Sequence, residues 1–91
     1  MYDINYTHEF KRSFKRMQRR GVEETLFVEV VTTLSSKGEL PVKNKNHALK
    51  GILSGYYECH IKPDWLLIYA IDKKNKTITL YDTGTHSDLF K

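Results

Sequence analysis

Two histidines and an aspartate fall where a small sheet would bring them to one edge. His60 lies in an alternating segment, Asp64 in the turn that follows it, and His86 near the end of the chain. Imidazole titrates near neutral pH, so one ring can accept a proton while a second donates one. Cleavage of RNA by its own 2′-hydroxyl group needs such a base, such an acid and a cation beside the phosphate. These residue types are therefore suited to acid–base catalysis that requires no metal.

Two other interpretations of the same residues stay open. Histidine and aspartate also bind zinc, but the chain has no His-x-x-x-His pair and only one cysteine, Cys59. No metal ligand or cofactor is therefore assigned. The histidines could also be surface residues with structural hydrogen bonds, which is the ordinary role of an isolated imidazole.

The elements that would position these residues are three consecutive strands. Residues 57–62 alternate, with Glu58, His60 and Lys62 on one face. Pro63 and Asp64 form a tight turn, and residues 65–71 are almost wholly apolar, as in a central strand. A second turn over 72–76 leads to an alternating strand over 77–82. Short turns predict an antiparallel meander.

The meander predicts which residues meet. If its second turn is centred near residue 74, residue 83 lies beside residue 65, and His86 lies close to Asp64. His60 is two residues before the first turn, so it joins the same end of the sheet. Trp65 and Phe90 could be core residues, or could stack on an unpaired base. Periodicity does not place His47.

The first half of the chain predicts two helices. Thr7 can cap a helix that ends at Gly21, and residues 23–37 form a second helix that ends at Gly38. The short break between them predicts an antiparallel helical hairpin. Basic residues line the outer side of the first helix, as a solvated face or as a contact for phosphates or an acidic partner: Lys11, Arg12, Lys15, Arg16, Arg19 and Arg20.

Composition predicts one globular domain spanning residues 1–91, with α+β architecture in which the helical hairpin packs on a small antiparallel sheet. The net charge of +4 comes from residues 1–50, which carry ten Lys or Arg and six Asp or Glu. Such a basic stripe indicates a polyanionic partner. No apolar run is long enough to span a membrane, the N-terminus lacks the layout of a signal peptide, and the single cysteine fits a reducing cytoplasm.

Three segments together carry a family resemblance. Residues 47–51 (HALKG), 58–69 (ECHIKPDWLLIY) and 84–90 (GTHSDLF) closely resemble the YafQ branch of the RelE/ParE toxin superfamily. Over residues 1–46 the similarity is limited to helix pattern and basic charge. The resemblance implies a RelE-like α+β toxin of a type II toxin–antitoxin pair. It further implies a ribosome-dependent endoribonuclease that cuts messenger RNA in the ribosomal A site and so inhibits translation.

The resemblance also implies site residues. His47, His60, Asp64 and His86 match positions tied to catalysis, while Trp65 and Phe90 match positions that line the site, and Glu58 stands where the branch has an acidic residue. We expect His60 or His47 to be the base and His86 the acid, with Asp64 orienting a histidine. Lys50 or Lys62 could stabilise phosphate charge.

The expected partners are a cognate antitoxin, the ribosome and mRNA, with no membrane and no small-molecule cofactor. The basic helix could contact ribosomal RNA or receive an acidic antitoxin segment, and ribosome binding should weaken steeply with salt. Three alternatives remain: a ParE-like gyrase inhibitor without catalysis, an RNA- or ribosome-binding module that is not a toxin, and a metalloprotein. The gathered histidines argue against the first, because a gyrase binder has no need of them.

Overall fold

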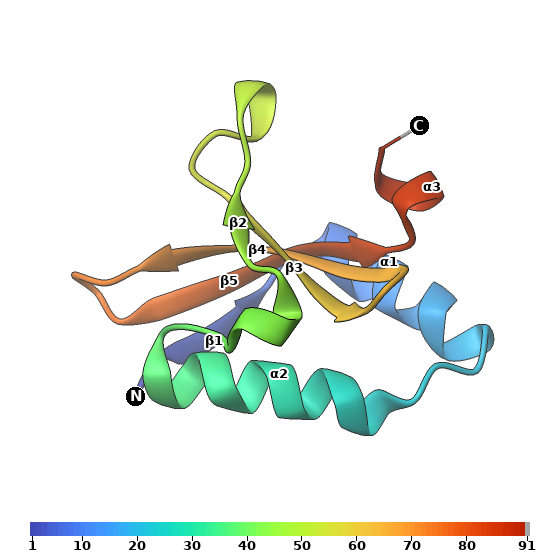
Figure 1. Ribbon diagram of the computed structural model, residues 1–91, viewed down its shortest axis with the longest axis horizontal. Coiled ribbons are helices and arrows are strands. Elements are labelled where there is room, and N and C mark those ends of the chain that lie inside the picture. Colours follow the sequence, from blue (N-terminus) through green and yellow to red (C-terminus); the bar gives the residue numbers. More distant parts are fainter. Residues whose placement is uncertain (91) are drawn as a thin grey trace.

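Five strands and three α-helices make up the computed structural model, which describes residues 1–90 (Figure 1). The sheet has the order β1-β5-β4-β3-β2. In chain order the elements are β1 (Asp3–Tyr6), α1 (His8–Arg19), α2 (Glu24–Lys37), the 3₁₀ turn η1 (Val42–Asn44), β2 (His47–Ala48), the 3₁₀ turn η2 (Gly51–Leu53), β3 (Tyr57–Lys62), β4 (Trp65–Asp72), β5 (Thr77–Gly84) and α3 (His86–Leu89).

The α+β class is confirmed, and the sheet is mixed where a wholly antiparallel one was expected. β2, β3, β4 and β5 pair antiparallel, but β1 pairs parallel to β5. The chain leaves β1 directly into α1, and it returns to β5 only after the other strands. No turn signal records this long-range pairing, so local patterns could not predict its direction.

Local signals explain the two long helices. The Thr7 side chain accepts a hydrogen bond from the backbone N–H of Phe10 at 2.9 Å, as expected for an N-cap. Gly38 ends α2 with φ +70°, a left-handed conformation that glycine adopts without strain. The expected boundaries at Thr7 and Gly38 are therefore confirmed.

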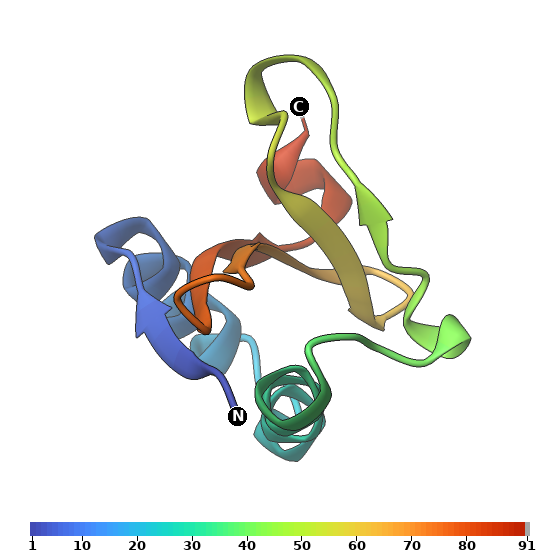
Figure 2. The same cartoon turned by 90° about the vertical axis from the view of Figure 1, so that its left-hand side faces the viewer.

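Both helices cover one face of the sheet and enclose the hydrophobic core. Figure 1 shows α2 beneath the strands, while α3 and the loop between β2 and β3 lie on the opposite side, as the rotated view also shows (Figure 2). Rings of Phe10 and Phe14 on α1 lie 5.7 Å and 4.7 Å from the Phe27 ring on α2. The helices meet the strands through a core of apolar side chains: Phe10, Met17, Phe27, Val30, Leu34, Cys59, Trp65, Leu67, Tyr69, Ile78 and Leu80.

The meander is present, with a register two residues away from the expected one. Thr83 lies opposite Leu67, where the turn position predicted residue 65. Part of the difference arises at a β-bulge, because Tyr69 pairs with Leu80 while Ile68 pairs with Asp82. The extra residue, Tyr81, is not encoded in the alternation. His86 still reaches Asp64, because α3 begins directly after β5 ends.

Among residues 1–90, none of the helices has the length and apolar character needed to span a membrane.

Candidate active site

The face of the sheet opposite the long helices carries a row of imidazoles and carboxylates. His60 on β3 is registered with Leu66 on β4, and Glu58 is registered with His47 on β2. Leu66 is fully buried and forms part of the floor of this face. We call the five residues His47, Glu58, His60, Asp64 and His86 the histidine row.

Glu58 joins two of the imidazoles. Its carboxylate oxygen Oε1 lies 3.3 Å from His47 Nε2 and 3.7 Å from His60 Nε2, and its side chain is only 7% exposed. The Nδ1 atoms of the two rings lie 3.0 Å from the Lys45 carbonyl oxygen and 3.3 Å from the Pro63 carbonyl oxygen. If Nδ1–H donates to these carbonyls, each ring presents Nε2 for proton exchange. The Glu58 carboxylate faces Nε2 of both rings, so it stabilises either ring when that ring carries a second proton as an imidazolium.

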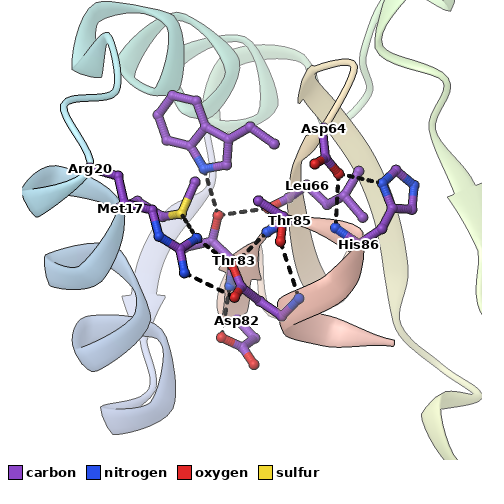
Figure 3. Close-up of polar contacts among 10 residues, drawn as sticks. Met17, Arg20, Asp64, Leu66, Asp82, Thr83, Thr85 and His86 are labelled. Atoms are coloured by element: carbon purple, nitrogen blue, oxygen red, sulfur yellow. Dashed lines mark hydrogen bonds and ion pairs between the residues drawn. The ribbon is translucent and has the colours of Figure 1, made fainter. Parts of the chain in front are cut away.

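His86 and Asp64 form a second pair at the other end of the row. Figure 3 shows the ring facing the carboxylate, with Nδ1 of His86 2.6 Å from Oδ1 of Asp64. The backbone N–H of His86 donates to the same oxygen at 2.9 Å. These hydrogen bonds, the backbone one first, hold the pKa of Asp64 below its usual value. The anionic carboxylate thus fixes the Nδ1–H tautomer and leaves Nε2 of His86 free.

The two parts of the row are adjacent. The ring centroids of His60 and His86 are 5.7 Å apart, with the rings inclined at 57°. One phosphodiester can bridge such a gap, because each imidazole must come within about 3 Å of the oxygen it serves. The His60 side chain is 17% exposed and that of His86 is 56% exposed, so both can be reached from solvent. The arrangement supports one base and one acid acting on a single substrate.

Two asparagines fix the loop that delivers His47. The buried side chain of Asn44 donates to the backbone carbonyl of His60 at 2.8 Å, and Asn46 accepts a hydrogen bond from the Tyr69 hydroxyl at 2.6 Å. The loop is thereby tied to β3 and β4 just before β2 begins. Periodicity does not place His47, and the lysines and asparagines that precede it are typical of an ordinary loop.

A basic hollow opens beside His60. It has a volume of about 200 Å³, and its lining includes Lys43, Lys45 and Lys62. Lys43 and Lys45 were not among the expected site residues, because nothing in the loop sequence placed them near β3. Lys62 was expected to share a face with Glu58 and His60. A register shift between His60 and Lys62 interrupts the alternation, and the Lys62 ammonium group lies 3.6 Å from Glu23 Oε1.

The short helix α3 is held by a capping box and by the guanidinium group of Arg20, the residue that follows α1. The Thr85 hydroxyl accepts from the Asp88 backbone N–H at 3.1 Å, while the Asp88 carboxylate accepts from the Thr85 N–H at 2.9 Å. Arg20 donates to both Asp88 oxygens, at 2.7 and 3.1 Å. A Cβ atom on Gly84 would lie 2.9 Å from Asp88, so glycine is needed there. Arg20 was expected to contact RNA or a partner, but its guanidinium group is engaged here.

This cluster predicts a pH-dependent contribution to stability. The Arg20 hydrogen bond, followed by that from Thr85, lowers the pKa of Asp88 far below its usual value. A lowered folded-state pKa stabilises the fold above the unfolded value of about 3.9 and loses that effect as the pH falls further. The Asp88→Asn variant should therefore be less stable than the wild type at pH 7. In urea unfolding, the difference in the free energy of unfolding between wild type and Asp88→Asn should become smaller between pH 5 and pH 2. A difference that stays constant over this range would contradict a lowered pKa of Asp88 as its cause.

Trp65 does not line the site. Its side chain is 2% exposed and belongs to the core, and its indole N–H donates to the Thr83 hydroxyl at 2.9 Å. The Thr83 hydroxyl in turn donates to the Leu66 carbonyl at 2.6 Å. The expected stacking of Trp65 on an unpaired base is wrong, because the ring points to the helix side of β4. Phe90, in contrast, is 44% exposed just after α3, and Lys50 is exposed before η2.

Trp65→Phe should therefore affect stability more than substrate binding. The variant loses a buried hydrogen bond and part of a packed ring, and the free energy of unfolding should fall by about 1–3 kcal/mol. Urea unfolding measures this loss. The KM for substrate should stay at the wild-type value. A raised KM with unchanged stability would mean that the indole contacts substrate after all.

The rest of the basic helix is exposed. Arg12 pairs with Glu9 within α1, and Lys11 and Lys15 border a shallow apolar hollow beside Phe14. Arg16 and Arg19 are also exposed on α1. The basic face is thus exposed to solvent, except that the guanidinium group of Arg20 is hydrogen-bonded to Asp88 of α3.

Known proteins resemble the chain over nearly its whole length. A family model described as "Bacterial toxin of type II toxin-antitoxin system, YafQ" matches residues 2–91. The mRNA interferase toxin YafQ of Escherichia coli K12 is 34% identical over 89 residues, which are 97% of this chain and 95% of that protein.

Solved structures agree with these matches. The toxin in the crystal structure of the E. coli DinJ–YafQ complex is 33% identical, with a TM-score of 0.90 and complete coverage of both chains. A metal-bound toxin from Helicobacter pylori is 39% identical, with a TM-score of 0.90 over 99% of this chain and all of that one. In this chain, residues 1–90 contain no group of three or more His, Cys, Asp or Glu side chains placed to hold a metal ion. The family match and the fold together show that the chain belongs to the YafQ family of bacterial toxins of type II toxin–antitoxin systems.

Proposed function

We propose that this chain is an mRNA interferase, an endoribonuclease that cuts messenger RNA in the ribosomal A site and so inhibits translation. Its similarity to relatives named mRNA interferase toxins supports the enzyme class. The observation that carries the proposal is the spacing of His60 and His86, whose rings lie 5.7 Å apart beside Asp64.

The proposed reaction is an internal displacement at phosphorus. His60 removes the proton of the 2′-hydroxyl group, and the 2′-oxygen forms a bond to the adjacent phosphorus atom. The bond from phosphorus to the 5′-oxygen breaks, and His86 donates a proton to that oxygen. The products are a 2′,3′-cyclic phosphate and a 5′-hydroxyl end. Asp64 orients His86 by accepting from the Nδ1–H of its imidazole, and the Glu58 carboxylate stabilises the imidazolium that His60 becomes on taking up the proton.

His60 is favoured over His47 as the base because of where the rings lie. The His60 ring lies next to the His86 ring, whereas the His47 ring lies on the far side of the Glu58 carboxylate. The negative charge on the reacting phosphate needs a cation nearby. Lys45 lines the hollow beside His60 and is the best placed for this role. The Lys62 ammonium group lies 3.6 Å from Glu23 Oε1, and Lys50 lies on the loop before η2.

The proposed partners follow from the family and from the charge. The DinJ–YafQ complex supports a cognate antitoxin for this chain. The exposed basic residues of α1 would track ribosomal RNA phosphates or receive an acidic antitoxin segment, and both would act in the cytoplasm. The chain itself would need no cofactor.

A cleavage assay on purified ribosomes programmed with a defined mRNA tests this proposal. Cuts should appear within the A-site codon, with 2′,3′-cyclic phosphate ends, and the same mRNA without ribosomes should stay intact. A gyrase supercoiling assay run in parallel covers the non-catalytic alternative. Inhibition of gyrase together with intact mRNA would overturn the nuclease proposal, and metal found by elemental analysis of an active preparation would reopen the metalloprotein alternative.

A further inference from the structure

Two tyrosines lie beside the histidine row and take no part in the chemistry described above. Tyr56 precedes Glu58 by two residues, which places both on the same face under strand alternation. Tyr81 is the extra residue of the β-bulge in β5, between Leu80 and Asp82. The centroids of the two tyrosine rings are 4.8 Å apart, inclined at 40°. The bulge therefore brings an aromatic ring from β5 onto a ring that precedes β3.

The pair lies close to the proposed reaction centre. Asp82 and Glu58 are both registered with Ile68, one from each side of β4. The tyrosine pair thus borders the Glu58 end of the histidine row, on the same sheet. A strand of RNA that places its phosphate between His60 and His86 would extend neighbouring nucleotides over this part of the sheet.

The backbone on both sides of the pair is fixed. The Thr7 hydroxyl donates to the Tyr81 carbonyl at 2.7 Å, and the Leu49 N–H donates to the Tyr56 carbonyl at 2.9 Å. Both tyrosines are partly exposed, and within residues 1–90 neither hydroxyl group makes a hydrogen bond to protein. The rings are held in place while part of each remains accessible to a ligand.

Charge indicates which part of RNA would bind. The acidic side chain next to Tyr81 is Asp82, whose Oδ1 accepts from the Thr83 N–H at 2.8 Å. A carboxylate repels a phosphate group but accepts hydrogen bonds from the amino groups of bases. Aromatic rings offer the surface on which unpaired bases stack.

We propose that Tyr56 and Tyr81 form a stacking site for one nucleobase flanking the scissile bond of the substrate RNA. The inference rests on the proposed endoribonuclease function, since it names a subsite of that same substrate. It assigns the two rings to binding, and it leaves the proton transfers to the histidine row.

Matched variants of Tyr81 separate stacking from packing. Tyr81→Phe keeps the aromatic face, whereas Tyr81→Leu keeps an apolar cover over the sheet and removes that face. In ribosome-programmed cleavage, Tyr81→Leu should raise KM by about 10-fold or more while kcat stays near the wild-type value. Tyr81→Phe should retain the wild-type KM. Equal KM values for the two variants would overturn the proposal.

A second readout does not depend on cleavage. Ribosomes programmed with an mRNA that carries 2-aminopurine at one position in or beside the A-site codon are titrated with the His86→Ala variant, and stacking should quench the fluorescence at a position next to the scissile bond. Tyr81→Leu in the same background should remove the quenching, as should Tyr56→Leu if Tyr81→Leu fails to fold. Absence of quenching at every position would overturn the stacking site. Quenching without any cleavage by the wild type would instead count against the proposed nuclease function alone.

Discussion

Replacing His86 by alanine is expected to lower the rate of mRNA cleavage by roughly 10²- to 10⁴-fold, the usual worth of a general acid. The leaving 5′-oxygen would depart without a proton, because in the described part of the chain, residues 1–90, His86 is the imidazole paired with Asp64. Single-turnover cleavage on programmed ribosomes measures the chemical step, and expression of the variant should no longer arrest growth. Circular dichroism should remain that of the wild type, since the His86 side chain is 56% exposed and outside the core.

His8 provides the matched control for this experiment. It is exposed at the first position of α1, and within residues 1–90 no hydrogen bond or ion pair joins its side chain to the histidine row. His8→Ala should cleave at the wild-type rate and remain toxic. A His86→Ala protein that still cleaves or still arrests growth would remove His86 from the mechanism and leave Asp64 without its proposed purpose.

Local chemistry explains why much of the fold could be predicted from sequence. Thr7 caps α1, Gly38 ends α2, and Pro63 with Asp64 turns the chain between β3 and β4. Each of these signals acts between residues close in sequence, so it can be recognised without knowing the tertiary structure. The convergence of His60, Asp64 and His86 followed from turn positions, and the structure confirms that they lie together.

The structure differs from the sequence-based prediction where the strand alternation is interrupted or where the contacting residues are far apart in the sequence. A bulge at Tyr81 shifts the register, and a second irregularity before Lys62 removes that lysine from its expected face. The pairing of β1 with β5 and the placement of His47 beside Glu58 depend on segments that meet only in the folded chain. No periodic signal in one strand reports its partner.

Some residues that position the site carry a recognisable sequence signal. Thr85 and Asp88 are three residues apart, the spacing of a capping box, and this pattern alone predicts a helix start just before His86. Tyr56, two residues before Glu58, could likewise have been placed on the site face by alternation. Trp65 was misassigned because β4 is buried on both faces, where alternation does not distinguish core from site.

His60→Ala is expected to lower cleavage by roughly 10²- to 10⁴-fold, and His47→Ala to stay within about tenfold of the wild type. The two histidines share Glu58, so the contrast depends on position alone. The ring centroids of His60 and His86 lie 5.7 Å apart, so both rings can reach one phosphodiester. The His47 ring contacts the Glu58 carboxylate instead. Single-turnover rates of the two variants on the same programmed ribosomes give the comparison.

The dependence of the cleavage rate on pH identifies the base, whatever the size of the rate loss in each variant. A base must be unprotonated to act and an acid must be protonated, so the wild-type rate should rise and then fall as the pH increases. His60→Ala should remove the rise on the acidic side, and His86→Ala should remove the fall on the alkaline side. His47→Ala should keep both limbs. If the acidic limb disappears in His47→Ala and persists in His60→Ala, the base is His47, and the substrate must then lie across Glu58 instead of between His60 and His86.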